Sequence, residues 1–152
     1  MIFRRLQDHP RLLEWAYDAT ESALAPLRRF LVPGSRTARV AAWVERLGKG
    51  AVFDCRMCGQ CVLHSTGMTC PMTCPKHLRN GPCGGVRADG HCEVLPDRSC
   101  VWVQAWERSR RMPAYGDDIR QLLPPLNHSL QDTSAWANDL HSREQLAPRA
   151  WT

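Results

Sequence analysis

The sequence contains no apolar run that approaches the roughly 20 residues of a membrane-spanning helix. Its first ten residues, MIFRRLQDHP, also lack the apolar core and the small-residue cleavage site of a secretory signal peptide. These absences predict a protein that neither enters a membrane nor is secreted, and we expect it in the cytoplasm. Thiols stay reduced in that compartment, so abundant cysteine there indicates metal ligands more than disulfides.

The chain is also short and lacks the glycine-rich signature of dinucleotide-binding enzymes. Its 152 residues are too few for a complete (β/α)₈ barrel, which takes about 250 residues. No G-x-G-x-x-G segment is present either. Most two-domain cofactor enzymes are therefore excluded, and no catalytic acid or base can be named in this chain.

Basic residues exceed acidic ones only moderately. The chain carries 20 Lys+Arg and 15 Asp+Glu, a formal charge of +5, and its 43% of hydrophobic residues suffices for one core. The excess is largest between residues 55 and 112, where eight basic residues stand against four acidic ones. It is compatible with nucleic-acid binding and with compensation of a negative centre inside the protein. Because no aromatic stacking platform accompanies it, we expect no nucleic-acid partner.

The pattern divides the chain into three parts and predicts a small, α-plus-irregular, metal-cluster-stapled domain. Residues 1–52 are predicted to form an N-terminal helical arm, residues 53–112 a cysteine-rich loop core, and residues 113–152 an extended tail that packs on the domain or on a partner. The middle part holds all eight cysteines and six of the ten glycines, with one short helix expected near residues 101–110. Loops so poor in aliphatic residues need a bound centre to become ordered. Trp136 and Trp151 indicate that the polar tail lies on another surface.

Two amphipathic helices are expected in the arm. Asp8 can cap the first, whose first turn contains Pro10, and Ser35 can cap the second, which is expected to end at Gly48. The apolar positions at helical spacing are Leu13, Ala16, Tyr17 and Leu24 in the first helix, and Val40, Val44 and Leu47 in the second. These faces are predicted to pack on the cysteine region or a partner chain, or to close the domain's own core.

The cysteines carry the chemistry of the sequence. They are Cys55, Cys58, Cys61, Cys70, Cys74, Cys83, Cys92 and Cys100. The first three form a C-x₂-C-x₂-C triplet, a spacing that lets three thiolates hold three of the four irons of one cubic cluster. A tetrahedral zinc usually takes a C-x₂-C pair. The triplet and the total of eight therefore favour two 4Fe-4S clusters, with two zinc sites as the alternative and disulfides as the least favoured interpretation.

The division of the cysteines between two clusters is less determined than their number. The triplet is predicted to share one cluster, with Cys100 as its fourth ligand. The second cluster is then expected on Cys70, Cys74, Cys83 and Cys92, and an exchange of Cys92 and Cys100 is nearly as favourable. His64, His77 and His91 are expected to be loop or outer residues more than ligands. Lys76 and Arg79 are predicted to compensate the negative charge of the clusters.

The cysteine motifs resemble one known family. Cys55-x₂-Cys58-Gly59-x-Cys61 is followed by Thr66-Gly67-x₂-Cys70-Pro71-x₂-Cys74-Pro75-Lys76, by Asn80-Gly81-Pro82-Cys83-Gly84-Gly85, by Gly90-x-Cys92-Glu93-Val94 and by Cys100-x-Trp102. Over about residues 50–110 these motifs closely resemble the methylenetetrahydrofolate reductase C-terminal domain family, which includes MetV-like small iron–sulfur subunits. The segment 133–138 resembles that family's Ser-Trp-Asn signature, with Ala135 where the family usually has serine.

The resemblance implies an iron–sulfur accessory subunit of one-carbon (folate) metabolism. In that family such a chain pairs with a barrel-type, flavin-containing reductase subunit, so FAD or FMN, the folate and the nicotinamide are expected on a partner within a hetero-oligomer. Two functions follow. The chain either relays electrons to or from the partner's flavin, or it is a structural subunit whose zinc or iron–sulfur centres only order the loops. The electron-transfer function is the favoured prediction.

Overall fold

The computed structural model describes residues 4–143. About half of these residues are helical, and within this range the only β-type pairings are the isolated bridges Val86–Cys92 and His91–Ser99. The helices in chain order are η1 (Arg4–Asp8), α1 (Pro10–Leu24), η2 (Ala25–Leu27), α2 (Arg36–Phe53), η3 (His64–Thr66), η4 (Pro71–Thr73), α3 (Val101–Ser109), η5 (Gly116–Arg120), η6 (His128–Leu130) and α4 (Ala135–Leu140). This small, helical and otherwise irregular fold agrees with the α-plus-irregular prediction.

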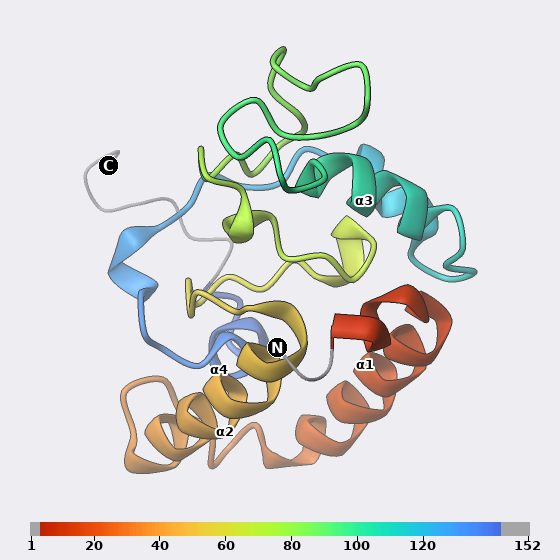
Figure 1. Ribbon diagram of the computed structural model, residues 1–152. Helices are drawn as coiled ribbons and strands as arrows, with labels where there is room; N and C mark the ends of the chain where they lie inside the picture. Colours follow the sequence, from red (N-terminus) through yellow and green to blue (C-terminus); the bar gives the residue numbers. More distant parts are fainter. Residues whose placement is uncertain (1–3, 144–152) are drawn as a thin grey trace.

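The helices surround the cysteine loops. In Figure 1, α1 and α2 lie at the lower side, α3 lies at the upper right, and the loops that carry the cysteines occupy the space between them. The segment between Pro75 and Cys100 contains no helix and forms the upper edge in that view. α4 packs against α2, and α3 packs against η3, η4 and η5. The fold therefore places its irregular middle part on a helical support.

The N-cap of the first helix lies one residue later than predicted. It is His9, which makes no side-chain capping hydrogen bond, while Pro10 occupies the first turn as expected. Asp8 instead ends η1 and forms an ion pair of 3.4 Å with Arg108. Leu13 and Tyr17 of α1 pack on the cysteine region. The arm therefore contacts the cysteine loops directly, as one of the two predictions for its apolar face required.

The second helix begins as predicted and ends later. The hydroxyl of Ser35 accepts a hydrogen bond from the backbone N–H of Ala38 at 3.1 Å, which confirms the cap. The predicted end at Gly48 is wrong, because α2 continues to Phe53 and stops at Asp54, whose φ is 53°. Glycine lowers helix propensity by only about 1 kcal/mol, a cost that the contacts of the last two turns outweigh. The extension brings Cys55 directly after the helix end.

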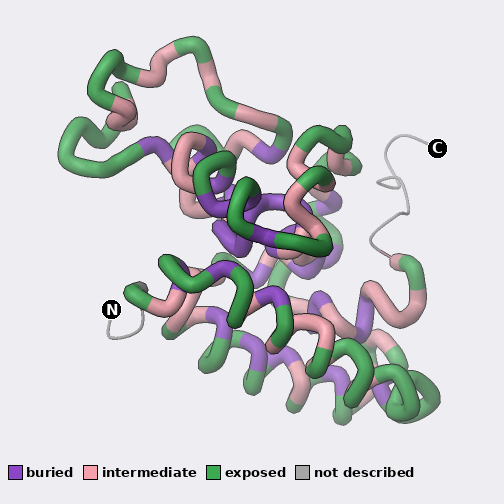
Figure 2. Tube along the Cα trace, turned by 90° about the vertical axis from the view of Figure 1, so that its right-hand side faces the viewer, coloured by how far each residue is buried: buried purple, intermediate pink, exposed green. Residues whose placement is uncertain are grey.

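The interior consists of three small apolar clusters joined by buried polar side chains. The first joins Leu31 to α2 and α4, the second surrounds Met68 between α1 and the cysteine loops, and the third surrounds Ala105 in α3. Figure 2 shows buried residues concentrated where helices meet loops, with the outer sides of the helices exposed. The buried polar side chains include Glu14, Glu45, Lys49, Gln60, Arg79, Arg108 and Asn138. A protein with so little continuous apolar core depends on paired polar groups for its order.

The tail contains more helix than predicted. It forms η5, η6 and the six-residue α4, while residues 122–127 form neither helix nor strand. Trp136 belongs to α4 and packs against α2, where the ammonium of Lys49 lies 4.4 Å from the centroid of the Trp136 ring. The prediction that Trp136 contacts another surface is therefore confirmed. Trp151 lies outside the described residues. Among the described residues, no helix combines the length and hydropathy needed to cross a bilayer.

We predict a pH-dependent stability that originates at His64. Its ring lies 5.4 Å from Tyr17 and 5.8 Å from Tyr115 between ring centroids, and burial lowers the pKa of His64 below its ordinary value of 6.5. The unfolded chain therefore binds this proton at a higher pH than the folded one, so the free energy of unfolding decreases as pH falls through 6.5 and below.

Urea unfolding between about pH 7 and pH 5 measures this dependence. The variant His64→Phe should show a flatter decline than the wild type. His128→Gln, which changes an exposed histidine, should keep the wild-type slope. An unchanged slope in His64→Phe would show that other groups control the acid response.

Candidate metal centre

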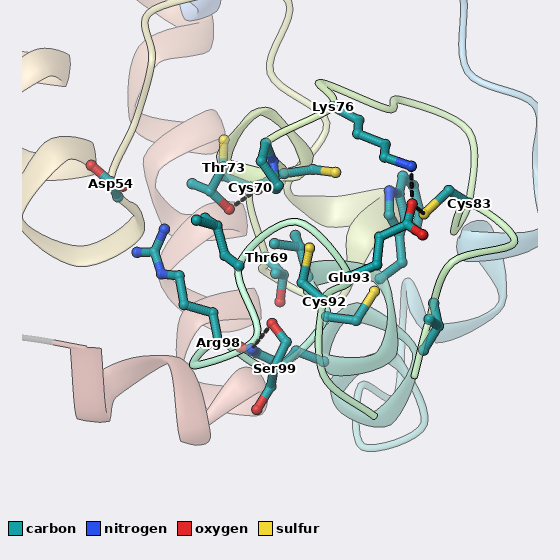
Figure 3. Close-up of a pocket in the computed structure, with 18 of the residues that line it drawn as sticks. Asp54, Thr69, Cys70, Thr73, Lys76, Cys83, Cys92, Glu93, Arg98 and Ser99 are labelled. Atoms are coloured by element: carbon teal, nitrogen blue, oxygen red, sulfur yellow. Dashed lines mark hydrogen bonds and ion pairs between the residues drawn. The ribbon is translucent and has the colours of Figure 1, made fainter. Parts of the chain in front are cut away.

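A cavity of about 250 Å³ lies where the loops between η4 and α3 fold back on themselves. One water molecule needs about 10–15 Å³ of such space, so the cavity has room for a group of several atoms. Five cysteines line it: Cys70, Cys74, Cys83, Cys92 and Cys100. Figure 3 shows Cys70, Cys83 and Cys92 arranged around this space, with Lys76 and Glu93 at one side. We refer to it as the large cavity.

A second, much smaller cavity of about 20 Å³ adjoins the C-x₂-C-x₂-C triplet. The cysteines that line it are Cys55, Cys58, Cys61 and Cys70. Met57, Leu63 and Met72 supply apolar walls. We refer to it as the triplet cavity. Cys70 borders both spaces, so the two groups of cysteines are neighbours.

This placement differs from the sequence-based division of the ligands. Cys100 lines the large cavity and not the triplet cavity, whereas Cys70 borders the triplet. The physical reason is local. The bridges of residues 86–92 and 91–99, together with the bond from the Cys100 N–H to the Gly90 carbonyl at 2.9 Å, keep Cys100 beside Cys92. Cys100 therefore lies with Cys74, Cys83 and Cys92 at the large cavity, and Cys70 lies between these four cysteines and the triplet.

The backbone of the triplet loop is held from outside by side chains and by the tail. The four residues between the three cysteines each have their carbonyl oxygen accepting a hydrogen bond. The donors are Gln131 Nε2 to Arg56 O at 2.9 Å, Asp132 N to Met57 O at 2.8 Å, Asn138 Nδ2 to Gly59 O at 2.9 Å, and Arg79 Nη1 and Nη2 to Gln60 O at 3.3 and 3.2 Å. The tail and Arg79 thus determine how these peptide groups are oriented.

The orientation of these carbonyls decides where the N–H groups point. In a trans peptide the C=O and the following N–H are coplanar and point in opposite directions. In the peptide between Arg56 and Met57, both polar groups have a partner. The Arg56 carbonyl accepts a hydrogen bond from Gln131, and the Met57 N–H donates to Cys55 Sγ at 3.4 Å. At this peptide the outward carbonyl directs the amide toward a thiol, which suits a sulfur ligand.

Gly59 allows the tail to approach this loop closely. Its φ is +73°, and a Cβ placed there would lie 2.2 Å from the carbonyl oxygen of Leu130. Any side chain at this position would clash with the backbone of the tail, and the positive φ would strain the backbone of the substituted residue. The glycine beside Cys58 is thus required by a close backbone contact, and not by turn conformation alone.

A buried ion pair lies next to the triplet. Glu45 and Lys49 of α2 are 1% and 8% exposed, and their charged atoms are 2.9 Å apart. Burial by itself lowers the pKa of Lys49, but the adjacent Cys61 and Glu45 outweigh burial and raise the pKa above its ordinary value. Lys49 therefore stays charged and supplies a positive charge at the triplet cavity, whose lining includes it.

Burial keeps two of the thiols protonated when nothing binds them. It raises the pKa of Cys55 to about 11, an effect that the Met57 N–H partly offsets. It also raises the pKa of Cys70 to about 12, to which the neighbouring Cys55 and Cys61 contribute. Metal binding at these positions must therefore displace protons, since the thiolate is the ligand form.

The structure separates the charged and imidazole groups that the sequence placed near the cysteines. Arg79 is 8% exposed and lines the triplet cavity, as its predicted role requires. Lys76 is more exposed and pairs with Glu93, a carboxylate that also accepts from Cys83 Sγ at 3.7 Å. The three histidines of this region, His64, His77 and His91, all belong to the described residues and line neither cavity.

Glu45 and Lys49 were not identified from the sequence, because both lie in the helical arm, away from the cysteine block. The sequence pattern that could have identified them is an oppositely charged pair four residues apart, on the helix face that also carries Ala38 and Ala42. No set of three or more Cys, His, Asp or Glu side chains within residues 4–143 meets the geometry of a single metal-ion site. The cysteines instead line two adjoining spaces.

These observations define a small cysteine-rich protein in which eight thiols line two neighbouring cavities on a helical support. Residues 35–129 match the family model described as "Methylene-tetrahydrofolate reductase C terminal". The chain belongs to this family, which confirms the resemblance of the cysteine motifs and extends it over α2. No curated protein and no solved structure matches the chain.

The close contact at Gly59 generates a prediction with a matched control. Gly59→Ala should lower the free energy of unfolding by roughly 1–3 kcal/mol, because the new Cβ meets the Leu130 carbonyl. Gly34→Ala should cost less, since Gly34 has a φ of +88° but no atom within 4 Å of the added Cβ. Chemical unfolding of both variants measures the difference. If both variants lose the same free energy of unfolding, backbone strain alone accounts for the requirement for glycine at position 59.

Proposed function

We propose that this chain is an iron–sulfur electron-transfer subunit of a methylenetetrahydrofolate reductase complex in one-carbon metabolism. Two 4Fe-4S clusters are its cofactors, one on Cys55, Cys58, Cys61 and Cys70, and the other on Cys74, Cys83, Cys92 and Cys100. The partner is a barrel-type reductase subunit that carries the flavin, and the complex works in the cytoplasm. When bound, such clusters supply one-electron transfer.

The observation that carries this proposal is that the eight cysteines line two adjoining cavities, five at the large cavity and four at the triplet cavity, with Cys70 in both. Four thiolates are the complement that a 4Fe-4S cluster takes. Cys70 borders both cavities, so the two sets are adjacent, which suits passage of electrons between them. Membership of the reductase family supports a partner that holds folate and flavin.

The chain's own residues have defined parts in this proposal. The eight thiolates hold the irons, and the Met57 amide donates to the sulfur of Cys55. Lys49 and Arg79 place positive charge beside the triplet and offset the negative charge of the cluster and its thiolates. The apolar walls of Met57, Leu63 and Met72 exclude water. These are the factors through which a protein sets the potential of such a centre.

A structural role is the second candidate. Cys61 and Cys70 pack with Leu63 and Met68, and Cys100 belongs to the cluster around Ala105. The cysteines are thus part of the core, and a metal that bound them, zinc included, would order the loops without any redox turnover. Metal identity and redox activity separate the two functions.

Anaerobic metal analysis of the purified chain tests the cofactor. We expect about eight irons per chain, broad absorbance near about 400 nm, and an electron paramagnetic resonance signal after reduction. Stoichiometric zinc without iron would contradict the electron-transfer proposal and favour the structural one.

Single cysteine variants test the division of the ligands. Cys55→Ser and Cys70→Ser should alter the same resonance signal, whereas Cys100→Ser should alter the other one. If Cys100→Ser and Cys55→Ser change one signal and Cys70→Ser the other, the original sequence-based division is right and the cavity-based one is wrong.

Asn138 tests the contribution of the tail to the triplet. Its side-chain amide is buried and donates to the Gly59 carbonyl at 2.9 Å. Asn138→Ala should lower the free energy of unfolding by about 1–3 kcal/mol and lower the midpoint potential of the triplet cluster, because the Gly59–Gln60 peptide is no longer fixed.

Asn80→Ala is the matched control, since Asn80 also ties the tail to a loop, through Leu123 at 2.9 and 2.7 Å, but lines neither cysteine cavity. It should leave the potential unchanged. A potential that is the same in Asn138→Ala and wild type, with full iron content in both, would show that the tail acts on stability only.

A further inference from the structure

Helix α2 turns its large apolar side chains outward. Val40, Trp43, Val44 and Leu47 are 62%, 62%, 51% and 54% exposed. They follow the i, i+3, i+4, i+7 spacing of one helix face. The residues buried on the opposite side are Ala38, Ala42, Glu45 and Lys49. The usual arrangement of an amphipathic helix is thus reversed, and we call the exposed stripe the Trp43 face.

The helix is held in this orientation by its buried carboxylate. Glu45 accepts a hydrogen bond from the Ser134 hydroxyl and from the backbone N–H groups of Ala135 and Trp136, at 3.3 and 3.2 Å for the two amides. Rotation of α2 to bury Trp43 would leave Glu45, Lys49 and the start of α4 without these partners. Unpaired buried charge is costly, so the Trp43 face stays exposed in the isolated chain.

The charge of the surrounding surface restricts what can cover the face. The exposed charged residues of α2 are Arg36, Arg39 and Arg46, of which Arg46 pairs with Asp132 at 2.5 Å, and the helix itself has no exposed carboxylate, because Glu45 is buried. Arg36 and Arg39 line an open hollow of about 390 Å³ together with Val40 and Trp43. A side chain that enters this hollow meets an aromatic surface and two guanidinium groups, which suits a carboxylate on an apolar base.

A second copy of the chain fits this surface poorly. Two identical faces related by a two-fold axis would meet with arginines and no exposed carboxylate of α2 on either side. A different protein with an apolar groove and an acidic rim satisfies both the stripe and its charges. Helix-in-groove binding of this kind uses anchors at i, i+3, i+4 and i+7.

We infer that the Trp43 face is the surface by which this chain docks on its reductase partner, in an apolar groove bordered by Asp and Glu. The existence of the surface rests on α2 alone, while the identity of its occupant rests on the proposed function. The cysteine loops between Pro75 and Cys100 lie at the opposite side of the molecule from α2 (Figure 1). Of α2, only its last residue, Phe53, lines the large cavity, so docking through the Trp43 face leaves that cavity accessible to an electron donor.

The test measures the dissociation constant between the purified chain and the flavin-containing barrel subunit of methylenetetrahydrofolate reductase from the same organism, without oxygen. Trp43→Ser should weaken binding by about tenfold or more, as expected for a central aromatic anchor. Trp15→Ser is the matched control, because Trp15 is 68% exposed on α1, and it should bind like the wild type. Unchanged circular dichroism confirms that both variants fold.

A charge reversal tests the acidic rim. Arg39→Glu should weaken binding severalfold and reduce its dependence on salt, whereas Arg110→Glu, an exposed arginine at the end of α3, should change neither. The salt series is measured with the same barrel subunit.

The outcomes separate this inference from the proposed function. If the wild type binds the barrel subunit and Trp43→Ser binds equally well, the Trp43 face is not the interface, while the subunit proposal stands. If the wild type does not bind at all, the subunit proposal and this occupant both fail, and iron content alone then decides the cofactor. If the wild type is a dimer that Trp43→Ser dissociates, a second copy covers the face and the inference is overturned.

Discussion

The structure depends on the need of buried backbone carbonyls for hydrogen-bond donors. The cysteine loops form no strand ladder in the described part of the chain, so their carbonyls cannot be paired within a sheet. Donors come instead from Arg79 and from the tail residues Gln131, Asp132 and Asn138. A buried carbonyl left without a partner would cost about 1–3 kcal/mol, which makes the tail a part of the cysteine region in energetic terms, although the two are far apart in sequence.

The same need explains why so many polar residues are buried in a protein with small apolar clusters. Glu45 accepts a hydrogen bond from a backbone N–H at the start of α4. Glu14 accepts from the backbone N–H groups of Ala114 and Tyr115. Arg108 donates to Gln7 and Thr69. Each of these side chains joins segments that are distant in sequence. Because they occupy the inner side of their helices, large apolar residues of α2 are displaced to the outside. The polar interior and the exposed Trp43 face are therefore two results of one arrangement.

The features predicted correctly from sequence are those determined by local chemistry. The Ser35 cap, the helix at residues 101–109 and the family follow from capping, periodicity and motif spacing. The inward face of α2 was not predictable, because its Glu45 is buried by an interaction with residues about 90 positions later. Cys70 borders both cavities, Cys100 is held beside Cys92 by the local bridges of residues 86–92 and 91–99, and the division of the ligands between two clusters stays a prediction. The eight cysteines as ligands stay a prediction.

The contact between Asn138 and Gly59 also has a consequence for biosynthesis. The two residues are separated by 79 positions, and a ribosome adds about 5–20 residues per second. The triplet is therefore synthesised about 4 to 16 s before the amide that fixes its loop. During that interval its thiols lack their final backbone geometry. The triplet loop can for this reason reach its final structure only after Asn138 has been synthesised.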